Sequence, residues 1–181
     1  MKASSKHVAL LRGINVGGKN MLPMKELAAM FAKAGCEDVV TYIQSGNVVF
    51  RAADKVVVGL GERIAKRVEA QFGIRVPVVL RSAAEVDAVV RRNPLLKVAT
   101  NAEMLHVCFL GDQPGKDLVA GLDAGRSSPD VFVVVGREIY MQLVNGMART
   151  KLTNAYFDSK LKTVSTMRNW RTVLKLAAML L

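Results

Sequence analysis

The order of strands and helices repeats once along the chain, and this repetition most narrows the possible folds. Apolar runs, helical spacings and turn residues between positions 8 and 80 predict the order strand, helix, strand, strand, helix, strand. Positions 105 to 165 predict the same order again. The sequence therefore predicts an α+β fold of duplicated ferredoxin-like (βαββαβ) units, with antiparallel sheets and an extra C-terminal helix.

In the first repeat, the apolar runs predict strands at Val8–Leu11, Val39–Ile43, Val48–Phe50 and Val76–Leu80. The first helix is expected to begin near Pro23, which suits a first helical turn, and to end at Gly35. The second has apolar residues at helical spacing over Val57–Val68 and ends at Gly73.

A connecting helix is expected between the repeats, because Ser82 and Glu85 have the spacing of a capping box and Asn93-Pro94 would stop it. In the second repeat, strands are expected at Leu105–Leu110, Val131–Val135, Ile139–Val144 and Lys162–Ser165. Helices are expected at Asp117–Leu122, at Lys151–Leu161 and from about Arg168 to the end. The predicted domains are a first half (1–81), a connecting helix and linker (82–103) and a second half (104–181).

Two short similarities support the duplication. His7-Val8 opens the first strand and His106-Val107 opens its counterpart, while Gly46 and Gly136 occupy equivalent hairpin turns. In a ferredoxin-like unit, the end of the first strand lies beside the turn between the second and third strands. We therefore expect three residues after the first strand to lie near three residues of that turn, namely Arg12, Asn15 and Lys19 near Gln44, Ser45 and Asn47.

The segment LRGINVGGKN at Leu11–Asn20 is the first candidate site. Gly17 and Gly18 can expose backbone N–H groups to a ligand, and Arg12 and Lys19 add positive charge, which together suit an anion. The spacing GxxxxGK resembles a P-loop, but Asn20 stands where the magnesium-binding Ser or Thr would be. The alternative is a structural loop whose glycines serve only tight geometry.

The segment NGMARTKLTN at Asn145–Asn154 is the second candidate, because Arg149, Thr150 and Lys151 are expected at the start of a helix, where N–H groups attract anions. The alternative makes Thr150 a simple N-cap with solvated neighbours.

The last candidate is the start of the final helix, capped by Ser165 or Thr166. There Arg168 and Arg171 share a face and could bind a phosphate or carboxylate, or else pair with acids, while Trp170 is expected in the core.

The balance of 26 Lys and Arg against 15 Asp and Glu gives a net charge of +11. Such a charge favours a polyanionic partner, and the alternative is a dispersed, solvated basic surface. No apolar stretch approaches the length of a membrane helix and the N-terminus has no signal-like core, so we expect a cytoplasmic protein that does not bind membranes. The oligomeric state is left open.

Signals for catalysis are few. His7 and His106 stand at strand starts without nearby acids, and Cys36 and Cys108 have apolar neighbours typical of buried thiols. No metal site is expected, and no cofactor or reaction is assigned. Base stacking on the sheet is not expected to carry binding, since Phe50 has only Tyr42 as an aromatic neighbour.

Four motifs along the chain carry a family resemblance: VALLRGINVGGKNMLPMKEL, TYIQSGNVVF, RTKLTN and MRNWRTVLKL. In this order they resemble the bacterial domain-of-unknown-function family 1697. The resemblance implies a paired ferredoxin-like architecture and transfers no catalytic residues. Members of that family commonly carry Gly-Arg-Ser where this chain has Ala148-Arg149-Thr150, so the hydroxyl is kept and the glycine is lost.

Two functional hypotheses follow, beside a purely structural or interaction domain. The first is a binder of a phosphate-bearing partner such as nucleic acid. The second is an enzyme acting on a phosphorylated or carboxylated small molecule, in a pocket formed by the Arg12–Asn20 loop and the Gln44–Asn47 turn.

Overall fold

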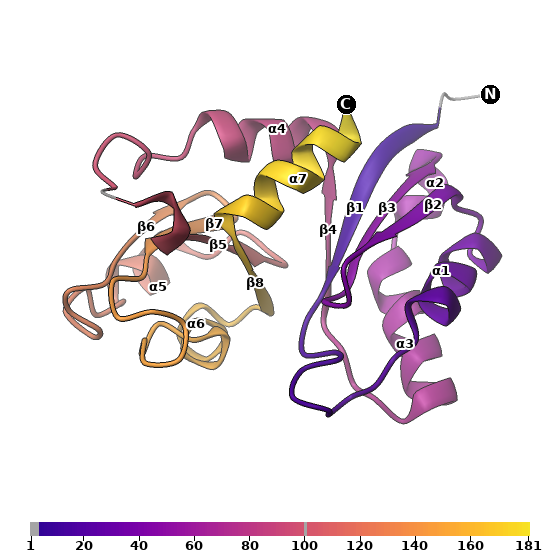
Figure 1. The fold of residues 1–181 in the computed structure, drawn as a ribbon, viewed down its shortest axis with the longest axis horizontal. Coiled ribbons are helices and arrows are strands. Elements are labelled where there is room, and N and C mark those ends of the chain that lie inside the picture. Colours follow the sequence, from indigo (N-terminus) through magenta and orange to yellow (C-terminus); the bar gives the residue numbers. More distant parts are fainter. Residues whose placement is uncertain (1–3, 100) are drawn as a thin grey trace. The chain divides into compact units, whose positions relative to one another are not determined.

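The computed structural model describes residues 4–99 and 101–181, and over these residues the chain forms two compact units, each built on a four-stranded antiparallel sheet (Figure 1). Unit 1 comprises the described residues up to Asp87 together with Leu176–Leu181, and unit 2 comprises Ala88–Lys175.

Unit 1 contains the first βαββαβ repeat that the sequence predicts. Its sheet has the strand order β2-β3-β1-β4 with antiparallel neighbours throughout, which confirms the predicted topology. Helices α1 and α3 lie on the same side of this sheet in Figure 1. The elements are β1 (Ser5–Leu11), α1 (Met24–Lys33), β2 (Glu37–Tyr42), β3 (Asn47–Ala52), α2 (Asp54–Val57), α3 (Leu60–Phe72) and β4 (Val78–Ser82).

The core of unit 1 joins these helices to the sheet. Leu27 and Phe31 from α1 and Ile64 from α3 pack with strand residues such as Phe50, all of them fully buried. The predicted second helix is interrupted, because Gly59 adopts a left-handed conformation with φ +65° and separates α2 from α3.

The connecting helix α4 (Ala83–Arg91) begins with the predicted capping box. The Ser82 N–H and hydroxyl donate to Glu85 Oε2 at 2.8 and 2.9 Å, and the Glu85 N–H donates back to Ser82 Oγ at 3.3 Å. Donor and acceptor groups at the helix start are thereby satisfied within four residues.

Unit 2 repeats the topology of unit 1, with strand order β6-β7-β5-β8 and antiparallel neighbours. Its core packs Tyr156, Phe157 and Leu161 of α6 against Cys108 and Ile139 of the sheet. The elements are η1 (Ala102–Met104), β5 (Leu105–Leu110), α5 (Lys116–Ala120), β6 (Val131–Val135), β7 (Glu138–Gln142), α6 (Asn154–Leu161), β8 (Ser165–Asn169) and α7 (Trp170–Leu180).

Two predicted helix starts in unit 2 are wrong, and in each case another residue caps the helix. Helix α6 begins at Asn154 rather than Lys151, because Thr153 Oγ1 accepts the Tyr156 N–H at 3.2 Å, so Thr150 is not the cap. Helix α7 begins after Asn169, whose Oδ1 accepts the Thr172 N–H at 2.8 Å.

The last strand lies later in the chain than predicted: it runs over Ser165–Asn169 and shares only Ser165 with the predicted strand Lys162–Ser165. Ser165 and Thr166 therefore cap nothing, and Arg168 is a strand residue. Trp170 is 5% exposed, as the prediction of a core residue required.

The two sheets correspond residue by residue at their centres. His7 and Val8 pair with Ser82 and Arg81, and in unit 2 the pairs His106–Asn169 and Val107–Arg168 occupy the same places. Both arginines are buried, and burial lowers the pKa of Arg168 to about 10. The equivalence of these pairs provides a register in which the two units can be compared.

Candidate anion-binding surfaces

The glycine-rich segment after β1 forms a small β-hairpin, called here the hairpin finger (Gly13–Leu22). Val16 and Lys19 form a β-bridge in which the Lys19 N–H donates to the Val16 carbonyl at 3.0 Å. Between them Gly17 and Gly18 have φ +57° and +74°, as a type I′ hairpin turn requires. The glycine pair thus makes a hairpin turn, whereas a P-loop would lead directly into a helix.

The Asn15 side chain closes the base of the hairpin finger. Its Oδ1 accepts the Leu22 N–H at 2.8 Å, and its Nδ2 donates to the Leu22 carbonyl and to the Gln44 carbonyl, each at 2.9 Å. The bond to Gln44 joins the finger to the β2–β3 turn and shows the predicted proximity for Asn15. Arg12, which was predicted to lie there too, lines a different surface.

The β2–β3 turn is fixed as closely as the finger. The Leu11 N–H donates to the Gly46 carbonyl at 2.8 Å, and a Cβ on Gly46 would lie 2.8 Å from Leu11 Cβ. Asn47 is fully buried, and its Nδ2 donates to the Tyr42 carbonyl at 3.1 Å and to Ser45 Oγ at 3.0 Å. The amides of Asn15 and Asn47 therefore hold the two loops in shape.

Other side chains of these loops extend into solvent. Lys19 and Gln44 are exposed, and within the described residues neither side chain has a hydrogen-bond or ion-pair partner. Val16 and Met21 are each 63% exposed. The finger therefore presents one cation and two apolar side chains on a backbone that its own hydrogen bonds hold in place.

Arg12 contributes to a different surface, beside α3. It lines an open pocket of about 430 Å³ together with Glu62, Lys66, Glu69, Arg75, Val76 and Pro77. Lys66 pairs with Glu62 at 2.7 Å, a hydrogen bond that raises the pKa of Lys66 and lowers that of Glu62, and Arg75 pairs with Glu69 at 2.6 Å. Because these four charges balance, Arg12 makes the pocket net positive.

In unit 2, the buried carboxylate of Asp130 holds a loop in shape through hydrogen bonds, as the Asn15 amide does in unit 1. Asp130, 2% exposed, accepts the Ser127 hydroxyl at 2.7 Å through Oδ2 and the Asn145 N–H at 2.7 Å through Oδ1. Burial opposes its charge, but the hydrogen bonds from Asn145, Ser127 and Thr150 outweigh burial and lower the pKa of Asp130.

Ser127 extends this network to the segment predicted as an anion site. The Lys151 N–H donates to Ser127 Oγ at 2.9 Å, and Asn145 Nδ2 donates to the Ser127 carbonyl at 2.9 Å. Thr150 is buried, and its Oγ1 accepts the Leu152 N–H at 3.1 Å. Thr150 thus supports the loop from inside and does not present its hydroxyl on the surface.

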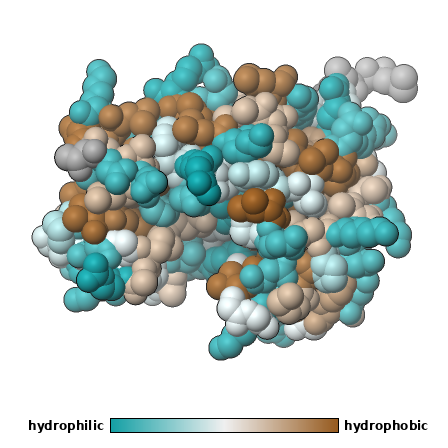
Figure 2. Space-filling model, viewed as in Figure 1, coloured by the Kyte–Doolittle hydropathy of each residue, from teal (hydrophilic) through white to brown (hydrophobic). Residues whose placement is uncertain are grey.

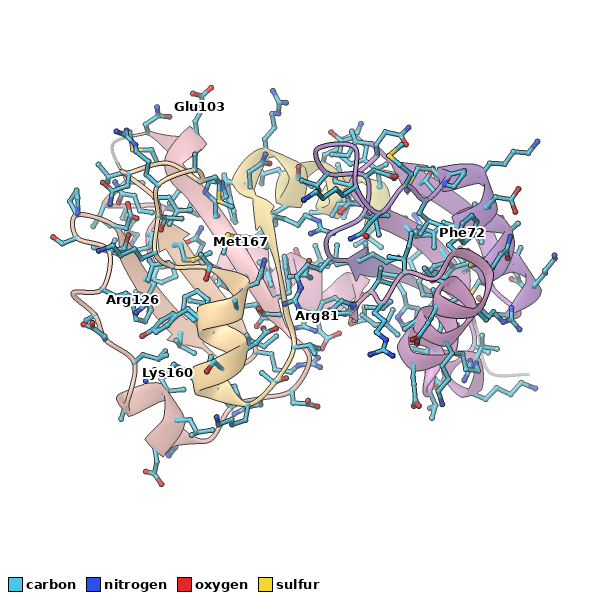
Figure 3. All side chains as sticks on the ribbon, turned by 90° about the horizontal axis from the view of Figure 1, so that it is seen from below. Phe72, Arg81, Glu103, Arg126, Lys160 and Met167 are labelled. Carbon is cyan, nitrogen blue, oxygen red and sulfur yellow. The ribbon has the colours of Figure 1, made fainter. Side chains whose placement is uncertain are left out.

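The basic loop of unit 2 is formed by three exposed side chains, Arg126, Arg149 and Lys151. Arg126 Nε donates to the Lys151 carbonyl at 3.0 Å, and its guanidinium carbon lies 4.1 Å from the Tyr156 ring centre (Figure 3). Sequence reasoning missed Arg126, because its loop has no periodic pattern; the spacing of Ser127 and Asp130 was the available signal.

Arg168 does not belong to this loop. It lies on β8, where its Nη1 donates to Thr166 Oγ1 and to the Met167 carbonyl, each at 2.8 Å. The prediction that it reaches a ligand from the final helix placed it on the wrong element.

The histidines and cysteines of the described chain are packed among other residues of the two units. Burial lowers the pKa of His7, which stacks on Phe50, and that of His106. Both cysteines are buried and neither forms a disulfide bond, and burial raises the pKa of Cys36 to about 11. Among residues 4–99 and 101–181, no three metal-ligating side chains gather, and no helix is long and apolar enough to cross a membrane.

The comparisons with known proteins agree with the fold. The family described as "Protein of unknown function (DUF1697)" matches residues 4–140, and the chain belongs to this family, which confirms the resemblance in the motifs. The conserved bacterial protein SP0830 from Streptococcus pneumoniae has a similar structure, with 26% identity and a TM-score of 0.70 over 98% of this chain and 99% of that one. No curated protein has a significant match to the sequence.

Proposed function

We propose that this member of the DUF1697 family binds a phosphate-bearing polyanion, and that the polyanion is nucleic acid. The hairpin finger is the observation that carries the proposal. Its backbone is held by Asn15 and by the Val16–Lys19 bridge, while Lys19 extends from it without a partner among the described residues. A cation on a fixed backbone loses less entropy on binding a phosphate than one on a disordered loop.

The distribution of charge supports several phosphate contacts rather than one. Both units carry more basic than acidic residues, and the chain as a whole has a net charge of +11. Each unit also holds a basic loop in place, with Lys19 on the first and Arg126, Arg149 and Lys151 on the second. On the face shown in Figure 2, hydrophilic side chains are spread widely over the surface. A polymer of phosphates can offer a separate phosphate to each of these basic loops.

The alternative of an enzyme for a small anionic substrate receives less support. It relied on the convergence of six side chains of the two loops, namely Arg12, Asn15, Lys19, Gln44, Ser45 and Asn47. In the structure the Asn15 amide donates to the carbonyls of Leu22 and Gln44, and the Asn47 amide donates to the Tyr42 carbonyl and to Ser45 Oγ. Few groups at this point are then left to orient a substrate.

The proposal is tested by fluorescence anisotropy with labelled RNA, single-stranded DNA and duplex DNA, each titrated over a range of salt concentrations. We expect binding at micromolar or lower concentrations in low salt that weakens steeply as salt rises, because each neutralised phosphate releases counterions. Inorganic phosphate and a phosphorylated sugar at millimolar concentration serve as competitors. Absence of nucleic-acid binding at low salt would overturn the proposal. Tight binding of the small phosphates in its place would favour the enzyme alternative.

A further inference from the structure

A second pocket, in unit 2, lies where β8 gives way to α7. It has a volume of about 380 Å³ and is lined by Ala102, Glu103, Asn169, Trp170, Arg171 and Leu174. Its apolar part comes from Ala102, the buried Trp170 and Leu174, which is 43% exposed. A partly exposed leucine beside a tryptophan gives an apolar ligand surface to cover.

Two hydrogen-bond donors stand at the rim of this pocket. Asn169 Oδ1 accepts the Thr172 N–H at 2.8 Å, which leaves its Nδ2 as a donor. Within the described residues, neither that Nδ2 nor the exposed Arg171 guanidinium has a hydrogen-bond or ion-pair partner. Two donors, one of them charged, fit the two oxygens of a carboxylate.

Glu103 limits the charge of the ligand. It lines the same pocket, and in Figure 3 its side chain extends outward from η1. With one carboxylate and one guanidinium among its lining residues, the pocket has no net charge, which disfavours a polyanion such as nucleic acid. A ligand with a single carboxylate can still accept hydrogen bonds from Arg171 and Asn169 while its apolar part covers Trp170 and Leu174. This pocket therefore differs in chemistry from the basic loops.

The side chains that line this pocket are not needed to form the fold, because the equivalent positions of unit 1 carry other residues. Asn169 pairs with His106 as Ser82 pairs with His7, so Trp170, Arg171 and Leu174 correspond to Ala83, Ala84 and Asp87. The equivalent positions of unit 1 therefore carry no aromatic ring, no cation and no exposed leucine. The pocket belongs to unit 2 through its side chains, on a backbone plan that both units share.

We propose that this pocket binds a small amphipathic monoanion, specifically an aromatic or alicyclic carboxylate. The ring lies against Trp170 and Leu174, and the carboxylate accepts hydrogen bonds from Arg171 and from Asn169 Nδ2. The inference is independent of nucleic-acid binding, since it uses other residues and another ligand.

The single tryptophan of the chain makes the test direct. Anilinonaphthalene sulfonate, an amphipathic anion, is titrated while Trp170 is excited, so that energy transfer reports probe bound in the neighbourhood of the indole. Benzoate and cyclohexanecarboxylate then compete with the probe, and benzamide serves as the neutral counterpart of benzoate. We expect both carboxylates to displace the probe at concentrations about tenfold lower than benzamide.

Substitutions of lining residues show whether the energy transfer and the displacement of the probe arise in this pocket. Arg171→Gln is expected to weaken benzoate about tenfold and benzamide little, while Ala102→Phe, at an exposed position, fills the pocket and abolishes energy transfer. Lys160→Gln, an exposed charge change on α6, is the matched control and leaves both unchanged. Near-ultraviolet circular dichroism confirms that each variant is folded. Equal displacement by benzoate and benzamide, or probe binding that survives Ala102→Phe, would overturn the proposal, as would no binding at millimolar concentration.

Discussion

The two units fix their basic loops by different chemistry on the same topology. In unit 1 a neutral amide, Asn15, closes the hairpin finger and joins it to the β2–β3 turn. In unit 2 a buried carboxylate, Asp130, gathers the Ser127 hydroxyl and the Asn145 N–H behind the basic loop. The difference shows that a polar network can be rebuilt with a charge while the fold is kept. It also gives the two loops different responses to pH.

The largest effect is expected at the hairpin turns, where Gly46 and Gly136 have similar φ values of +76° and +61°. A Cβ at Gly46 would lie 2.8 Å from Leu11 Cβ, whereas at Gly136 the nearest atom, Glu138 Oε2, would be 3.9 Å away. Gly46→Ala should therefore cost about 2–4 kcal/mol of unfolding free energy, and Gly136→Ala about 1 kcal/mol. Urea unfolding of both variants measures the difference. Equal losses would show that the loop contact in unit 1 does not carry this energy.

A second prediction compares the central side chains of the two networks. Asp130→Ala removes the carboxylate that accepts from the buried Ser127 hydroxyl and the part-buried Asn145 N–H, and it should cost about 2–4 kcal/mol. Asn15→Gly should cost about 1–2 kcal/mol, since Asn15 is only partly buried and glycine suits its φ of +53°. Gln44→Ala, which removes an exposed side chain, should change stability by less than about 0.5 kcal/mol. If Asn15→Gly cost no more than Gln44→Ala, the amide would not be what holds the finger.

The sequence was enough to predict the topology of both units and the position of Asn15, but not the hydrogen-bond network around Asp130. Apolar runs and the capping box of Ser82 and Glu85 were sufficient for the topology, and topology was sufficient to bring Asn15 to Gln44. The role of Asp130 could not be predicted, because it depends on a hydroxyl three residues earlier and an N–H fifteen residues later. Arg168 was misplaced for a related reason: helical spacing continues backward into β8, and only the Asn169 cap marks where α7 begins.

A third prediction uses the pH response. Because hydrogen bonding in the folded state lowers the pKa of Asp130, its contribution to stability is fully present above the unfolded pKa of about 3.9 and is lost as the pH falls through the lower folded value. Asp130→Asn should remove this dependence, so the stability difference from the wild type should shrink below about pH 4. Urea unfolding at several pH values between 3 and 7 measures it. Asn15→Gly, which removes no titrating group, should keep a constant difference over the same range.

The smallest expected effect on stability comes from the exposed cations themselves. Lys19→Gln and the pair Arg149→Gln and Lys151→Gln should each change the free energy of unfolding by less than about 0.5 kcal/mol, since these side chains lie on the surface. Thermal or urea unfolding checks this. A larger loss would mean that these basic side chains themselves help to hold the loops in shape, in addition to the hydrogen bonds of Asn15 and Asp130.

The salt dependence of nucleic-acid binding tests the central claim most directly, that two fixed basic loops contact phosphates. The slope of log affinity against log salt is compared for the wild type, for a triple variant (Lys19→Gln, Arg149→Gln, Lys151→Gln) and for a control of equal charge (Lys25→Gln, Lys33→Gln, Lys160→Gln). We expect the first variant to reduce the slope by about one unit for each cation removed, and the control to leave it nearly unchanged. Equal reduction in both variants would contradict the account, because the attraction would then come from the overall charge and not from the loops.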